Sequence, residues 1–244
     1  EHQRQFRDEP IGEQEAIKLR RKMIESPDEV TDGELQRILD LYDAEIRYAD
    51  AEIGRLIDGV RSAWGDDTHV CFTADHGEEF LDHGLFSHHT TFYDEVIHVP
   101  LVLSTDGGRR DELAGLLDVP PTLVDAAGLD APQTYCGRSL LDTLDGEWER
   151  TEVLGTKDDG EGGRIFAYRD HDWKYITRPA ETELYELADD PGERTNVVDG
   201  HPGIVAEADR HVEELRDAIE ETNVDLGDVE MDENVKQRLR DLGY

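Results

Sequence analysis

The chain has 244 residues, with 60 acidic and 25 basic side chains, which give a formal net charge of −35. This length suits one large domain or a domain with a smaller appendage, and a hydrophobic share of 36% is enough to bury a core. The acidic excess and the lack of a basic cluster exclude a nucleic-acid-binding protein, because such proteins neutralise phosphates with lysine and arginine.

The composition also bears on the cellular setting. Only five of the 25 basic residues are lysine, which is similar to folded proteins of salt-accumulating halophiles such as archaea. No apolar run is long enough to span a membrane, and the two cysteines, Cys71 and Cys136, do not make a disulfide framework. Because no signal peptide is visible, the expected location is the cytoplasm.

The first predicted element is a long helix. Residues 1–30 are polar and show no clear periodicity, so no element is predicted there. A helix then begins after Thr31, whose hydroxyl can form a capping box with Glu34 three residues later. Apolar residues follow at helical spacing in one stripe. They predict a single amphipathic helix that ends near Gly65.

The next segment alternates between strands and helices. Short apolar runs at residues 69–74 and 99–103 predict strands, and the first has the character of a buried strand of a parallel sheet. A helix is expected at residues 120–128, where Asp118 can serve as the N-cap, prolines occupy the first turn and Gly128 ends the helix. This order predicts an α/β architecture with helices on both faces of the sheet.

The sequence changes in character after about residue 151. Short β-like runs, separated by turns rich in glycine, aspartate and proline, predict a small antiparallel sheet. The runs cover residues 152–155, 165–169, 173–177 and 183–187. Helices are expected at residues 204–219 and 235–242. We therefore divide the chain into an α/β part, residues 1–150, and a small-sheet subdomain with terminal helices, residues 151–244.

Four of the ten histidines lie between Phe72 and Glu95, directly after the first predicted strand. In open α/β sheets, ligands bind beyond the carboxyl ends of the strands, which is where Asp75 and His76 stand. A carboxylate beside an imidazole can bind a divalent cation. The Asp-His-Gly tripeptide is also compatible with a simple turn in which Asp75 caps a following helix.

Several segments in chain order resemble the second half of a sulfatase of the alkaline-phosphatase superfamily. They are LYDAEIRYADAEIGRLID, TADHGE followed by DHGLFSHHTTFYDEVIHVPLVL, DVPPTLVDAAGLDAPQTYCGRSLL, DWKYI with TELYELADDPGERTNV, and the final LRDLGY. The resemblance covers residues 35–200 and the terminus. It implies the C-terminal part of a doubly wound alkaline-phosphatase-like sheet, followed by a small antiparallel β subdomain with a helix.

The resemblance also implies an activity. The complete protein would be a sulfuric ester hydrolase that acts on a small anionic sulfate ester, and this chain would supply the second half of its metal-dependent site. Asp75 and His76 would complete the site of one divalent cation, Ca²⁺ in the first place and Mg²⁺ or Mn²⁺ otherwise. His88 stands where the family often has a lysine that touches the sulfate, so it would contact the substrate or act as general acid. His89 would take this role if the register differed by one, and a solvated loop histidine is the alternative for His88.

The nucleophile of the family has no match in this sequence. It is a formylglycine made from Cys or Ser in the motif C/S-x-P/A-x-R, whereas Cys71 precedes Phe-Thr-Ala-Asp and Cys136 precedes Gly-Arg-Ser-Leu. The formylglycine is therefore expected upstream, in an N-terminal half that would be the partner of this chain, and the chain alone is expected to be inactive. Two alternatives stay open: a phosphonate or phosphodiester hydrolase of the same superfamily, and a non-catalytic sulfatase-like fragment that acts as a partner module.

Overall fold

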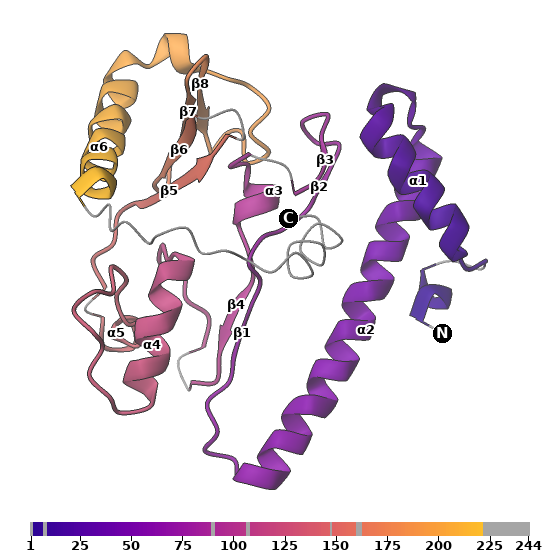
Figure 1. The fold of residues 1–244 in the computed structure, drawn as a ribbon, viewed down its shortest axis with the longest axis horizontal. Helices are drawn as coiled ribbons and strands as arrows, with labels where there is room; N and C mark the ends of the chain where they lie inside the picture. The colour runs from indigo at the N-terminus through magenta and orange to yellow at the C-terminus, as the bar shows by residue number, and fades with distance from the viewer. Residues whose placement is uncertain are drawn as a thin grey trace, which may run out of the picture.

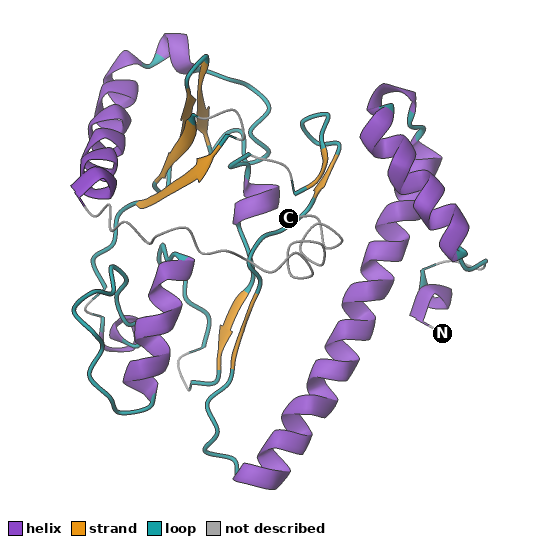
Figure 2. Cartoon of the chain, viewed as in Figure 1, coloured by secondary structure: helices purple, strands orange, loops and turns teal. Residues whose placement is uncertain are grey.

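The computed structural model describes residues 2–6, 9–88, 91–105, 108–146, 148–159 and 163–221, and its elements are drawn in Figures 1 and 2. Up to residue 150 the helices are α1 (Glu13–Glu25), α2 (Asp32–Trp64), α3 (Asp94–Ile97), α4 (Val119–Ala126) and α5 (Asp142–Asp145). The strands of this part are β1 (Cys71–Thr73), β2 (Glu79–Phe80), β3 (Phe86–Ser87) and β4 (Leu101–Leu103). The elements that follow are β5 (Val153–Asp158), β6 (Arg164–Arg169), β7 (Trp173–Arg178), β8 (Glu181–Glu186) and α6 (Pro202–Glu221).

The long helix α2 begins and ends as the sequence predicts. The Thr31 hydroxyl accepts a hydrogen bond from the Glu34 amide at 3.3 Å, and the Glu34 carboxylate accepts one from the Thr31 amide at 3.0 Å. A hydrogen bond from Lys22, together with those from Thr31, lowers the pKa of Glu34 to about 2. The helix stops before Gly65, whose φ of 100° favours glycine. The predicted helix and its capping box are therefore confirmed.

Helix α1 lies across the N-terminal end of α2 (Figure 1) and was not predicted. Its buried residues Leu19 and Met23 pack with Ile38 of α2 and Phe86 of β3. These two positions are one helical turn apart, and most of the other residues of α1 are polar. An apolar stripe of two residues is too narrow to give a periodic signal, so the expectation of no element in residues 1–30 was wrong.

Strands β1 and β4 form an antiparallel pair, with Phe72 opposite Val102. Both predicted strands are present, but the prediction of a parallel sheet is wrong for the described part of the chain. The connection between them contains a hairpin and the short helix α3. Its length would also allow a parallel crossover, so the direction of pairing is not set by the length of the connection. Phe72 and Val102 are 39% and 58% exposed, so the doubly wound sheet with helices on both faces is not seen among the described residues.

The C-terminal sheet is confirmed as a four-stranded antiparallel sheet in the order β5-β6-β7-β8. One face packs on α6 and carries Phe166, Tyr168, Tyr175 and Leu184. The opposite face carries Ile165, Ala167, Ile176 and Tyr185 and packs on Phe92 and Tyr93. Helix α6 confirms the helix expected at 204–219, whereas residues 235–242 lie outside the described residues. The division of the chain at residue 150 stays a prediction.

Helix α4 begins after Asp118, as predicted, but the Asp118 side chain does not cap it. The buried carboxylate instead accepts hydrogen bonds from the Gly115 amide at 2.8 Å and the Arg138 amide at 2.9 Å. Arg150 adds an ion pair at 2.6 Å. Asp118 therefore connects the loops on both sides of α4.

None of the helices in the described part of the chain combines the length and apolarity that a membrane crossing requires.

Candidate active site

The residues after β1 form a tight loop that is fixed to α3. The Gly77 amide donates a hydrogen bond of 2.7 Å to the Val96 carbonyl oxygen. A Cβ atom at position 77 would overlap the Glu95 carbonyl oxygen, so the close approach of the two backbones requires glycine. This contact fixes the place of Asp75 and His76, which directly precede it.

Asp75 and His76 bring one carboxylate and one imidazole donor close together. His76 Nε2 lies 3.8 Å from Asp75 Oδ2. The Gly77 carbonyl oxygen lies 2.9 Å from His76 Nδ1 and accepts its hydrogen, which assigns the lone pair of the ring to Nε2. The element that follows Asp75 is β2, so the alternative in which Asp75 caps a following helix is wrong.

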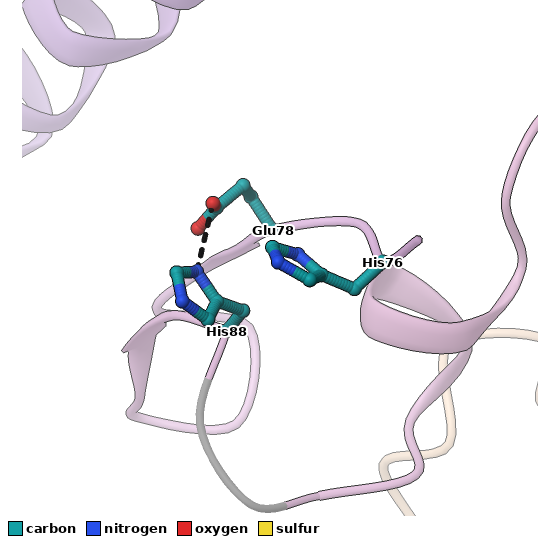
Figure 3. Close-up of side chains that lie close together, drawn as sticks. All are labelled: His76, Glu78 and His88. Carbon is teal, nitrogen blue, oxygen red and sulfur yellow. Dashed lines mark hydrogen bonds and ion pairs between the residues drawn. The ribbon is translucent and has the colours of Figure 1, made fainter. Parts of the chain in front are cut away.

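The β2–β3 hairpin brings His88 back to His76 (Figure 3). Glu79 pairs with Ser87 across the hairpin, so Glu78 and His88 lie opposite each other at its open end. His88 Nδ1 and Glu78 Oε1 are 3.0 Å apart, within hydrogen-bond distance. The rings of His76 and His88 stack, with their centroids 4.1 Å apart. The hairpin therefore brings together two histidines that are 12 residues apart in the sequence.

Of the four predicted site residues, the structure places His76 beside both Asp75 and His88. The fourth, His89, lies outside the described residues. Sequence reasoning did not include Glu78 in the site. The available signal was its position two residues after His76, directly before a short strand that could return in a hairpin.

The loop between β2 and β3 is held by buried polar contacts. The Glu79 carboxylate is fully buried and accepts a hydrogen bond of 2.7 Å from the His83 amide. The His83 ring stacks on Tyr93 with centroids 3.6 Å apart, and its Nε2 donates to the Glu193 carbonyl oxygen at 3.1 Å. Burial raises the pKa of Glu79. These contacts make His83 a structural residue of the hairpin, which in turn positions His88.

A buried ion-pair network joins α3 to the C-terminal sheet. Lys174 of β7 is fully buried, with Nζ at 2.5 Å from Asp94 Oδ1 and 2.8 Å from Glu193 Oε1. Arg169 of β6 pairs with Asp94 at 3.1 Å. Burial raises the pKa of Glu193. Burial also acts on Asp94, but the positive charges of Lys174 and Arg169 outweigh it and lower the pKa of that carboxyl.

The chain is similar to sulfatases along most of its length. The family model described as Sulfatase matches residues 2–129, and a model described as N-sulphoglucosamine sulphohydrolase, C-terminal, matches residues 81–223. Choline-sulfatase of Rhizobium meliloti is 33% identical over 190 residues, which is 74% of this chain and 37% of that protein. Arylsulfatase K of Bos taurus is 27% identical over 207 residues, which is 76% of this chain and 38% of that protein.

Solved structures show the same likeness. The phosphonate monoester hydrolase of Agrobacterium radiobacter superposes with a TM-score of 0.69 at 27% identity, over 79% of this chain and 44% of that chain. A protein in complex with its substrate D-glucosamine-2-N,6-O-disulfate gives a TM-score of 0.68 at 23% identity, over 80% of this chain and 43% of that chain, a likeness of fold alone. The chain spans less than half the length of the curated relatives named above. Because the Sulfatase model covers more than half of its residues, the chain belongs to the sulfatase family of the alkaline-phosphatase superfamily.

Proposed function

We propose that the complete protein containing this chain hydrolyses small anionic sulfate esters, and that the chain supplies the second half of the active site. The observation that carries this proposal is that His76, in the loop after β1, lies beside both Asp75 and His88. Membership of the sulfatase family supports the reaction class. The nucleophile, a formylglycine in this family, would come from residues outside the chain.

Asp75 and His76 are the residues that would hold a divalent cation, Ca²⁺ in the first place and Mg²⁺ or Mn²⁺ otherwise. Their donor atoms are 3.8 Å apart and the Asp75 side chain is 69% exposed, so the pair fits part of a cation site. Ca²⁺ takes about six to eight ligands, so the others would come from outside this chain. When bound, the cation would supply positive charge for the sulfate oxygens in a protein whose net charge is −35.

His88 would contact the sulfate group or protonate the leaving alkoxide. Its Nδ1 faces the Glu78 carboxylate at 3.0 Å, which orients the ring. A carboxylate behind an imidazole also stabilises the charged ring that donates the proton, as in other acid–base pairs. The role of His88 therefore depends on Glu78 as an orienting partner.

Exposed apolar side chains support the proposal that another part of the complete protein packs against this chain. Ile46, Leu56 and Trp64 of α2 are exposed, as are Phe72 of β1 and Val102 of β4. Large exposed apolar surfaces mark interaction sites. We propose that the other half of the complete protein covers them.

The second candidate function is hydrolysis of phosphonate monoesters or phosphodiesters, which the likeness to the Agrobacterium radiobacter enzyme favours. The test compares kcat/KM of the complete protein for 4-nitrophenyl sulfate and for 4-nitrophenyl phenylphosphonate. We expect the sulfate ester to be the better substrate. A preference for the phosphonate would reverse the two functions, and turnover of neither would indicate a non-catalytic partner module. Turnover by the isolated 244-residue chain would contradict the location of the nucleophile outside it.

A further inference from the structure

Among the described residues, three side chains that could bind one metal ion lie close together: His76, Glu78 and His88. One donor atom of each lies within 4.8 Å of the other two. All three side chains are partly buried, so an ion bound among them would keep access to solvent. Figure 3 shows the three side chains converging from the loop after β1 and from the end of the β2–β3 hairpin.

The chemistry of these donors differs from that of a calcium site. Two imidazoles and one carboxylate suit a first-row transition metal, whereas Ca²⁺ prefers a larger set of oxygen ligands. Zn²⁺ held by three protein ligands commonly keeps a fourth position for water. We propose that His76, Glu78 and His88 form a binding site for a transition-metal ion, with Zn²⁺ as the simplest case.

The backbone already places the three residues for this role. In a tetrahedral zinc site with bonds of about 2.0–2.1 Å, donor atoms lie about 3.4 Å apart. The donor atoms lie within 4.8 Å of one another, so the side chains must close in by at most about 1.4 Å. They must also exchange the contact between Glu78 and His88 for bonds to the ion. Side-chain rotation supplies this movement, because the pairing of Glu79 with Ser87 keeps the hairpin ends in place.

Neighbouring groups can orient both rings around the ion. The Gly77 carbonyl oxygen holds Nδ1 of His76, which leaves Nε2 as the ligand. His88 Nδ1 also lies 3.2 Å from Ser87 Oγ, a contact that can orient this ring while Glu78 turns to the ion. Such outer contacts to a ligating histidine are a regular part of metal sites.

The proposed ion would share His76 with Asp75. One imidazole nitrogen binds one ion at a time. A transition metal on Nε2 of His76 would therefore prevent His76 and Asp75 from binding the divalent cation proposed above. The binding itself depends only on His76, Glu78 and His88. The competition, by contrast, rests on the proposed function.

The test is a titration of the purified chain with Co²⁺ at about pH 8, above the ordinary histidine pKa of about 6.5. The d–d absorption of the bound ion reports binding, and added Zn²⁺ should displace it. We expect one ion per chain, with affinity lowered at least about 10-fold in Glu78→Gln and in His88→Lys, whose ammonium group is not a ligand. Asp75→Asn and His98→Ala, which removes an exposed histidine, should bind as the wild type does.

Two results would overturn the proposal. If Asp75→Asn weakens Co²⁺ binding as much as Glu78→Gln does, the ion belongs to the pair of Asp75 and His76. If Glu78→Gln and His88→Lys bind like the wild type, the ion occupies adventitious surface carboxylates only. Far-UV circular dichroism of each variant separates loss of a ligand from loss of fold. Because no turnover is measured, failure here is distinct from failure of the proposed hydrolysis.

Discussion

Lys174→Met is expected to lower the free energy of unfolding by about 3–5 kcal/mol, because it removes one partner of a buried ion-pair network. Lys174 is fully buried between Asp94 and Glu193, at 2.5 and 2.8 Å. Methionine keeps most of the side-chain volume but leaves Glu193 without this cation, while Asp94 keeps Arg169. Urea unfolding measures the change.

The matched control is Lys157→Met, which changes an exposed lysine of β5 and should stay within about 0.5 kcal/mol of the wild type. Equal unfolding midpoints for Lys174→Met and the wild type would show that the network contributes nothing to stability.

The effect of Lys174→Met should also depend on pH. The lowered pKa of Asp94 gives stability that is present above the unfolded pKa of about 3.9 and is lost as the pH falls below it. The raised pKa of Glu193 acts in the opposite sense, since its ionised form costs stability as the pH rises through the folded pKa. Protonation of both carboxyls removes the need for a buried cation. The difference between variant and wild type should therefore shrink below about pH 4, and a constant difference would point to packing alone.

In the complete protein, His88→Ala is expected to lower kcat/KM for an alkyl sulfate by about 100-fold or more, because general acids contribute about 100- to 10,000-fold. An alkoxide leaves poorly without a proton, whereas 4-nitrophenolate leaves readily. A general acid therefore predicts a smaller loss with 4-nitrophenyl sulfate, and a contact to the sulfate group predicts equal losses with both esters.

The control for this measurement is His98→Ala, because His98 is an exposed histidine of the same segment. It should leave kcat/KM unchanged for both esters. If His88→Ala behaves like His98→Ala, His88 takes no part in the reaction.

The parts of the fold that depend on local chemistry could be predicted from the sequence. The capping box of Thr31 and Glu34 needs only four consecutive residues, and turn residues bound each strand of the C-terminal sheet. The direction in which β1 pairs could not be predicted, because a short apolar run has the same composition in either kind of sheet. Helix α1 was missed because its inward face consists of Leu19 and Met23.

The site could be predicted only in part, because some of its contacts depend on how strands pair and not on neighbouring residues in the sequence. Asp75 and His76 follow a strand directly, so their place at its carboxyl end is visible in the sequence. Glu78 meets His88 only through the register of the β2–β3 hairpin, which no local pattern fixes.

Lys174 meets Asp94 across 80 positions of the chain, and this contact depends on the packing of the C-terminal sheet against α3. The available signal was the position of Lys174 two residues before Ile176, which places both side chains on the same face of β7. That face is buried, and an unpaired lysine there would cost free energy.

The most direct test of this account is the cation dependence of sulfate-ester turnover by the complete protein and its Asp75→Asn variant. Asparagine keeps the shape of the side chain but removes the charge that would bind the cation. We expect kcat/KM to fall by about 100-fold or more and the cation concentration for half-maximal activity to rise. Asp67→Asn, which changes an exposed carboxylate before β1, should alter neither value. Full activity of Asp75→Asn with an unchanged cation requirement would contradict the account.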